Sequence, residues 1–312
     1  MENAFCKMNW KNWAGNVRSN PIEISYPKNE EEVVAVVKRA NSEGKKIRVV
    51  GSGHSFSHVA ATDSILVSLD EMQGVIDSDT ELRTATVWGG TKLKRLGELL
   101  FELELAQENM GDINVQSIAG ALSTGTHGTG AELQTLSNQI LEVTFVDGKG
   151  EVITVSQDSD PELFQAIRVS IGTLGIITRL KLKLDKAYKL EELTRKESLQ
   201  DCLAKLDEYV KDNRNFEFFW FPHTETVQTK FLNITDKPLK KAGFGKKLGD
   251  VVVENWLFWC MSTWAKWFPV ASKSVSKISA WGISNGNFVD WSHDIYATPR
   301  DVRFYEMEYN VP

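Results

Sequence analysis

The first part of the chain alternates hydrophobic and polar residues with two different periods. Every second residue is apolar within Pro21–Pro27, which predicts a strand. The next apolar positions fall on one face of a helix that Asn29 can cap and that extends through Asn41. A β-branched run at Ile47–Val50 predicts another strand. The pattern therefore predicts a β-α-β unit at the start of the fold.

Similar patterns continue as far as residue 184. Thr91 is expected to cap a helix over Lys92–Leu105, and Asp160-Pro161 to start a helix that runs through Arg168. The Asp-Gly-Lys-Gly sequence at 147–150 separates two alternating runs, which is typical of a hairpin. The predicted strands are Ile65–Leu69, Leu82–Val87, Ile140–Val146, Glu151–Val155 and Ile176–Leu184. These elements predict an α+β first domain over residues 12–185.

The pattern changes after Asp185, where a second, aromatic-rich domain over residues 186–312 is predicted. It is expected to contain a helix over Ser198–Val210 and three strands, Phe216–Phe221, Val227–Leu232 and Arg303–Val311. The last strand alternates up to Pro312 without a following element to cover it, so we expect this α+β domain to be incomplete.

One apolar stretch, Val251–Val270, is long enough to raise the question of a membrane. It contains Glu254, Asn255 and Lys266, which would be costly to bury in lipid. We therefore predict a buried helix of the second domain, with contact at a membrane surface as the alternative and a true span disfavoured.

The charge and cysteine content narrow the class of protein. The 312 residues include 36 lysines and arginines against 42 aspartates and glutamates, a net charge of −6, and no basic cluster suggests a nucleic-acid partner. Cys6, Cys202 and Cys260 are too few and too scattered for a disulfide framework or a metal cluster. Met1–Gly15 has no apolar run typical of a secretory signal. We expect a cytoplasmic protein.

A loop rich in glycine and serine, Gly51–Ser57, follows a predicted strand. Phe56 stands where the dinucleotide fingerprint needs its third glycine, and Ser57 stands where a nucleophile elbow needs its last one. His54 and His58 have the spacing of zinc ligands, but no further ligand completes a metal site. The alternatives that remain are a polar turn and a nest of backbone N–H groups that binds phosphate.

Two more runs favour the phosphate interpretation. Ser117–Gly130 again combines glycines, hydroxyl side chains and a histidine, and Gly172–Thr178 adds a third backbone that a ligand can approach closely. The first two runs suggest a diphosphate held from two sides, without the lysine of a P-loop.

These three runs, in this order, resemble the FAD-binding (PCMH-type) domain of flavoproteins of the vanillyl-alcohol-oxidase type. The similarity is greatest to the sugar-lactone and alditol oxidase branch, covers residues 12–184, and continues more weakly through Arg303–Pro312. It implies a two-part FAD-binding domain followed by a partial substrate domain.

The resemblance also implies roles for single residues. His54 matches the histidine that bonds covalently to the flavin, and Ile177 matches a residue whose backbone meets the cofactor, although a core isoleucine is an equal alternative. Ser117 matches a side chain near the substrate, with a structural hydroxyl as its alternative. The first cradle of the diphosphate would comprise Gly51, Ser52, Gly53, Ser55 and Phe56. The second would comprise Ser117, Gly120, Thr124, Gly125, Thr126 and His127.

In this branch, FAD oxidises a CH–OH group of a polyol or sugar lactone by hydride transfer to flavin N5, and dioxygen then reoxidises the flavin to give hydrogen peroxide. The branch's charged substrate-binding groups and its C-terminal His-Trp-Gly-Lys-type motif are expected beyond Pro312, and Glu306 and Glu308 do not replace them. Two alternatives stay open: a flavin dehydrogenase that uses another acceptor, and a non-catalytic flavin-binding remnant. Peripheral membrane contact stays open as an alternative.

Overall fold

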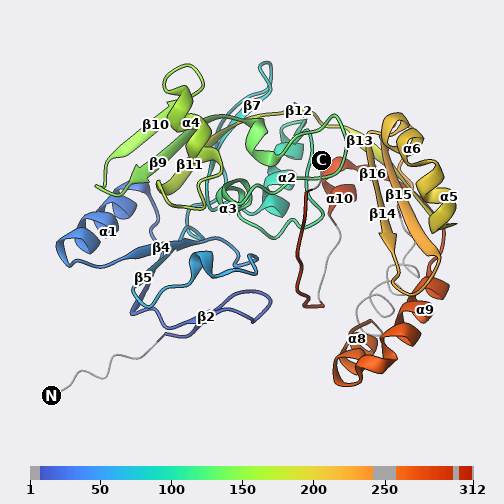
Figure 1. The fold of residues 1–312 in the computed structure, drawn as a ribbon. Coiled ribbons are helices and arrows are strands. Elements are labelled where there is room, and N and C mark those ends of the chain that lie inside the picture. The colour runs from blue at the N-terminus through green and yellow to red at the C-terminus, as the bar shows by residue number, and fades with distance from the viewer. Residues whose placement is uncertain (1–7, 242–257, 298–301, 311–312) are drawn as a thin grey trace. The chain divides into compact units, whose positions relative to one another are not determined.

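The computed structural model describes residues 8–241, 258–297 and 302–310. Its contacts divide the chain into two compact units (Figure 1). The first contains Met1–His127, Thr135–Lys186 and Arg303–Pro312, and the second contains Gly128–Gln134 and Ala187–Val302.

The β-α-β unit predicted from the sequence opens the first compact unit. Strands β3 (Glu23–Ser25), β5 (Ile65–Ser68) and β4 (Ile47–Val50) form a parallel sheet in that order. Helix α1 (Glu30–Ser42) begins at Asn29, whose side chain accepts a hydrogen bond from the Glu32 N–H. The apolar face of α1 is buried against β5 and two strands of a second sheet, so the predicted face and cap are both confirmed.

That second sheet has five antiparallel strands. Their order is β10 (Val152–Ser156), β9 (Ile140–Asp147), β11 (Gly175–Lys183), β7 (Thr84–Trp88) and β6 (Val75–Asp79). The register of β11 against β9 shifts between Ile177 and Arg179, which marks a bulge in β11. The short pairs are β1 (Trp10–Lys11) with β2 (Arg18–Ser19) and β8 (Leu105–Ala106) with β12 (Asp185–Lys186).

The helices of this unit differ in two places from the prediction. Helix α2 (Leu93–Glu102) is shorter than expected, and the Thr91 hydroxyl donates to the Trp88 carbonyl instead of capping it. Helix α3 (Ile118–Ser123) lies inside the second glycine-rich run, where no regular helix was expected. Helix α4 (Pro161–Arg168) begins as predicted, with Asp160 accepting from the Leu163 N–H. Single 3-10 turns are η1 (His58–Ala60) and η2 (Leu136–Gln139).

A four-stranded antiparallel sheet forms the centre of the second unit. Its order is β14 (Asn215–Trp220), β15 (Thr226–Ile234), β13 (Lys189–Ser198) and β16 (Gly286–Trp291). The helix expected over 198–210 is two short helices, α5 (Leu199–Ala204) and α6 (Leu206–Asp212), which meet at Lys205. Helix α10 (Ser292–Tyr296) follows the last strand.

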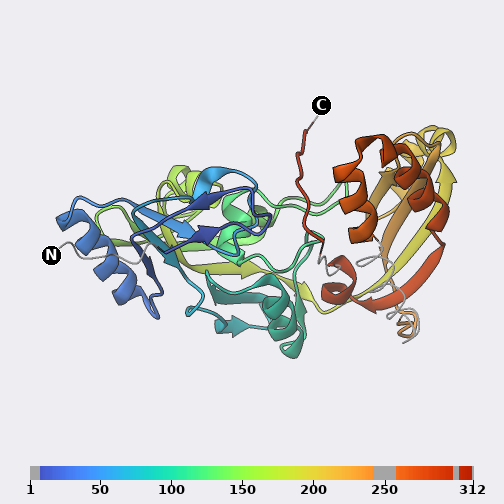
Figure 2. The ribbon, with the colours of Figure 1, turned by 90° about the horizontal axis from the view of Figure 1, so that it is seen from below.

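Two predictions for the second half are wrong within the described residues. Helix α8 (Phe258–Trp267) is not buried, since Trp264 and Trp267 are exposed, while Val251–Leu257 lies outside the described part. Residues 303–310 form no strand and belong to the first unit. Helix α8 is joined through η4 (Pro269–Ala271) to α9 (Ser272–Gly282), and Figure 2 shows the two helices side by side. No helix of the described residues has the length and apolar character needed to cross a bilayer.

Candidate functional site

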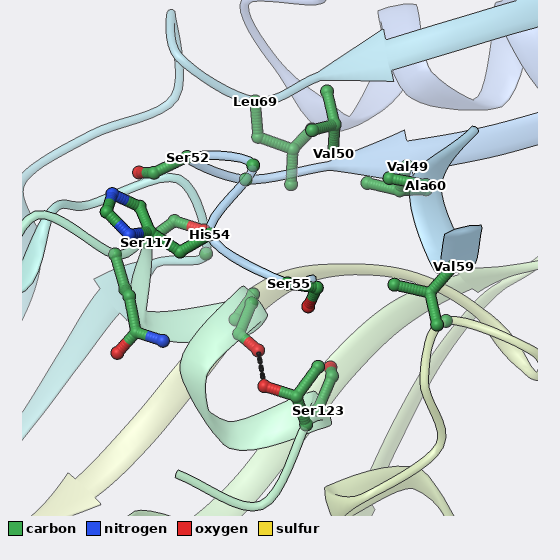
Figure 3. Close-up of a pocket in the computed structure, with 18 of the residues that line it drawn as sticks. Val49, Val50, Ser52, His54, Ser55, Val59, Ala60, Leu69, Ser117 and Ser123 are labelled. Carbon is green, nitrogen blue, oxygen red and sulfur yellow. Dashed lines mark hydrogen bonds between the residues drawn. The ribbon is translucent and has the colours of Figure 1, made fainter. Parts of the chain in front are cut away.

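A pocket in the first unit lies among the three glycine-containing runs (Figure 3). The loop after β4 forms one wall, α3 forms another, and Ile171–Ile177 contributes a third. His54, Ser52 and Ser117 lie at one end, and Val49, Val59 and Ala60 lie at the other. The predicted site residues that line the pocket are Gly51, Ser52, Gly53, His54, Ser55, Ser117, Gly120, Thr124 and Ile177.

The Gly51–Ser57 loop is held by its carbonyl groups. The Gly53 carbonyl accepts from the Trp13 N–H at 2.8 Å, and the Ser55 and Phe56 carbonyls accept from the side-chain amides of Asn12 and Asn16. Within the described residues, the N–H groups of Gly53, His54 and Ser55 have no acceptor. Gly53 has a φ of 67°, a conformation that favours glycine. The loop therefore presents donors in the manner of an anion-binding nest.

The first two glycine-rich runs meet at Ser117, a buried residue that precedes α3. A Cβ added at Gly51 would collide with the Ser117 hydroxyl, and one at Gly120 would lie 2.9 Å from the same oxygen. The missing side chains therefore let the backbones at 51 and 120 approach each other. Both runs face the pocket at this point, as the idea of a diphosphate held from two sides requires.

His54 is stacked on an aromatic ring. The Trp13 indole lies 4.9 Å from the imidazole, centroid to centroid, with 22° between the planes. Burial, together with the Lys92 ammonium, lowers the pKa of His54 below its ordinary value near 6.5. The imidazole is therefore neutral at neutral pH and keeps a lone pair available for bonding.

A charged pair stands beside the first loop. The Lys92 Nζ lies 2.7 Å from an Asp70 carboxylate oxygen and 3.0 Å from the Ser52 hydroxyl, which in turn donates to the Val115 carbonyl. These contacts fix the Ser52 side chain at the pocket wall. Asp70 also lines the pocket, and its carboxylate forms an ion pair with the Lys92 ammonium group.

Four of the predicted cofactor residues do not line this pocket: Phe56, Gly125, Thr126 and His127. The Phe56 ring lies 5.9 Å from that of Phe304, and the His127 Nε2 lies 2.6 Å from a Glu308 carboxylate oxygen. Gly125 has a φ of 73° at the end of α3. Their roles toward a cofactor stay predictions.

Sequence reasoning missed the residues that support the first loop, namely Asn12, Trp13 and Asn16, and the Lys92–Asp70 pair. The two asparagines sit four positions apart in a short polar segment, a signal too weak to indicate a partner so far along the chain. Their importance follows only from the contact of the segment between β1 and β2 with the loop.

Comparisons with known proteins agree with this geometry. Residues 21–156 match the family model of the FAD binding domain, and residues 180–312 match that of D-arabinono-1,4-lactone oxidase. A cholesterol oxidase variant from Brevibacterium sterolicum superimposes with a TM-score of 0.75 at 16% identity, over 95% of this chain and 63% of that one. The fold is thus that of the vanillyl-alcohol-oxidase class of flavoproteins, as expected.

The particular family follows from closer relatives. Over 304 residues the chain is 36% identical to an L-gulono-1,4-lactone dehydrogenase of Mycobacterium tuberculosis, which covers 97% of this chain and 70% of that protein. It is 33% identical over 238 residues to the L-gulonolactone oxidase of Bos taurus, covering 76% of this chain. It is also 33% identical over 264 residues to the D-arabinono-1,4-lactone oxidase of Kluyveromyces lactis, covering 82%. The chain belongs to the family of FAD-dependent sugar-lactone oxidoreductases, which confirms the expected family. It spans 54% and 50%, respectively, of the length of the last two relatives.

The pocket fits the FAD that this family binds. A diphosphate needs several donors and close backbone approach, and the loop at Gly53–Ser55 and the side-chain-free positions Gly51 and Gly120 supply both. The apolar end of the pocket, at Val49 and Val59, suits a flat aromatic ring system of FAD.

Proposed function

We propose that this pocket holds FAD and that the protein oxidises a CH–OH group of a sugar lactone or a related polyol. The observation that carries the proposal is that two glycine-rich runs meet at Ser117 and both line the pocket, while three N–H groups of the first run have no acceptor among the described residues. When bound, FAD supplies the redox chemistry by accepting two electrons from the substrate carbon. The chain's own residues bind and orient it.

His54 is proposed as the point of covalent attachment. Its neutral imidazole carries a lone pair, and the stacked Trp13 ring restrains its plane. The N–H groups of Gly53 and Ser55 would hold the nearby cofactor, and the Lys92 side chain would hold Ser52 in the same loop. Ser117, at the same end of the pocket as His54, is proposed to contact the substrate or the flavin.

The test is spectroscopic. The purified protein is expected to be yellow, to keep flavin absorbance in the acid-precipitated polypeptide, and to bleach when L-gulono-1,4-lactone, D-arabinono-1,4-lactone or xylitol is added without air. Flavin that stays oxidised with all of these reductants would favour the alternative of a non-catalytic flavin-binding remnant. A colourless protein that takes up no added FAD would contradict the proposal itself.

For the electron acceptor, we propose dioxygen, in line with the two relatives named oxidases. The relative at 36% identity is named a dehydrogenase, which favours a second candidate with a different acceptor. Peroxide formation and dye reduction, measured side by side with the same lactone, separate the two. Peroxide equal to the substrate consumed supports dioxygen, whereas rapid dye reduction with little peroxide supports the dehydrogenase. A cytoplasmic location stays a proposal from the sequence.

A further inference from the structure

Among the described residues of the second unit, the most exposed aromatic side chains lie on one pair of helices. We call α8, η4 and α9, residues Phe258–Gly282, the aromatic hairpin. At its turn, Trp267 is 75% exposed, Phe268 61% and Val270 94%. Trp259, Trp264, Ile278 and Trp281 are exposed along the two helices. Seven exposed large apolar side chains within these 25 residues mark an interaction site rather than an ordinary solvated face.

The charges on the aromatic hairpin are all of one sign. The segment contains Lys266, Lys273 and Lys277 and no acidic residue, although the whole chain has a net charge of −6. All three lysines are exposed. Lys273 and Lys277 stand four residues apart and Trp281 another four, so the three share one face of α9. The local positive charge therefore complements an anionic partner.

The hairpin is held to its own unit at the far end from the turn. The Lys196 Nζ donates to the Trp281 carbonyl at 3.3 Å, and the Lys196 N–H donates to the Asn285 side chain. Strand β13 thus anchors the end of α9, and the turn that carries Trp267 and Phe268 is left as the outer part. Figures 1 and 2 both show α8 and α9 beside the sheet rather than between its strands.

We propose that the aromatic hairpin docks the protein on an anionic lipid bilayer, with the Trp267–Val270 turn inserted among the headgroups. Tryptophan favours the boundary between water and hydrocarbon, and lysines beside it reach lipid phosphates. Helices of ten and eleven residues each rise only about 15 Å, roughly half of the hydrocarbon core. They suit insertion at the surface, and this role involves no residue of the cofactor pocket.

The experiment is cosedimentation of the full 312-residue chain with two kinds of vesicles, phosphatidylcholine alone and phosphatidylcholine containing phosphatidylglycerol. We expect binding to the anionic vesicles, weakened by added salt, and little to the neutral ones. Trp267→Ala with Phe268→Ala should lower binding at least about tenfold, because two large apolar groups no longer insert. Lys273→Glu with Lys277→Glu should lower it at least about 25-fold, since each lysine near an anionic surface contributes roughly fivefold.

The matched control is Tyr26→Ala with Leu82→Ala, which removes two exposed apolar side chains of the first unit. It should bind vesicles like the unsubstituted chain. All these residues are exposed, so circular dichroism and melting temperature should change little. The proposal is overturned if the chain binds neither kind of vesicle, binds both equally, or binds as well with either hairpin double substitution. It is also overturned if light scattering shows a dimer that the Trp267 and Phe268 substitutions dissociate, because the hairpin would then join two copies of this chain.

Discussion

His54 combines three properties in one side chain: it lies in the phosphate-type loop, it stacks on Trp13, and its pKa is lowered. His54→Ala should remove acid-stable flavin from the polypeptide while leaving room for FAD to bind without a bond. His58→Ala is the matched control, because His58 is an exposed histidine only four residues further on. Flavin absorbance of the acid-precipitated proteins provides the measurement. Equal absorbance in the His54→Ala and unsubstituted proteins would show that the attachment is elsewhere.

The lowered pKa of His54 also predicts how stability depends on pH. Unfolding exposes the imidazole, so the unfolded chain binds the proton more tightly than the folded chain does. Protonation of His54 therefore lowers the stability of the folded chain. This loss of stability is complete below the folded pKa and disappears as the pH rises through the ordinary value near 6.5. Melting temperatures of flavin-free protein should therefore rise with pH in this window, and less steeply for His54→Gln. His58→Gln should keep the full rise. An identical slope for His54→Gln would contradict this contribution.

Gly120 tests the second glycine-rich run in the same way. Gly120→Val would place a side chain against the Ser117 hydroxyl and obstruct the approach of the two runs. We expect the flavin content to fall several-fold, with a smaller loss of stability from the β-branched residue in α3. Gly148→Val, in the turn between β9 and β10 where an added Cβ meets nothing, should leave the flavin content unchanged. The ratio of flavin absorbance to protein absorbance measures the flavin content of each variant. An undiminished flavin content in Gly120→Val would mean that this run is only a structural turn.

Among the elements, the Gly51–Ser57 loop depends most on residues far from it in sequence. The Asn12 side chain is buried, donates to the Ser55 carbonyl and accepts from the N–H groups of Gly15 and Val17. Asn12→Ala removes the acceptor of the buried Val17 N–H and the donor to the Ser55 carbonyl, while the Gly15 N–H keeps its bond to the main-chain carbonyl of residue 12. Unfolding should therefore become easier by about 1–3 kcal/mol, and the flavin content should fall. Asn41→Ala loses only one exposed bond, to the Gly148 carbonyl, and should cost much less. Denaturant titrations of both variants test this, and equal costs would mean that Asn12 does not organise the loop.

Local signals were enough to predict most elements of the first unit. Asn29 and Asp160 act on backbone groups three residues away, and the Asp147–Gly150 turn joins neighbouring strands, so each signal lies within the segment it shapes. Strand β13 was missed because its ten residues carry many charges, and its place between β15 and β16 is decided by pairing with segments far along the chain. The exposed α8 was mispredicted because apolar composition alone does not say whether a partner covers it.

For the candidate site, the sequence identified the glycines and histidine that line the pocket but not what fixes them. Two runs of glycine and serine in one domain suggested close backbone approach to a ligand, and the family resemblance then singled out Gly51, His54 and Gly120. The contributions of Trp13 and Lys92 depend on contacts across the unit, 41 and 40 residues away from the groups they meet in His54 and Ser52. No local pattern encodes such distances. The family resemblance predicted the chemical roles of the site residues, whereas the contacts that hold them in place were found only in the structure.

At the scale of the whole molecule, every residue that lines the pocket belongs to the first compact unit. Ligand binding stabilises only those native contacts that it reinforces. Adding FAD to flavin-free His54→Ala protein should therefore slow amide exchange in the segments that line the pocket, chiefly Gly51–Ser57 and Ser117–Thr124. Exchange in the sheet formed by β13 to β16 should change little, and these strands serve as the internal control. Hydrogen exchange followed by mass spectrometry measures both regions in one sample. Protection that appears first in β13 and β15, without a change at Gly51–Ser57, would place the flavin site in the second unit and contradict the assignment of this pocket.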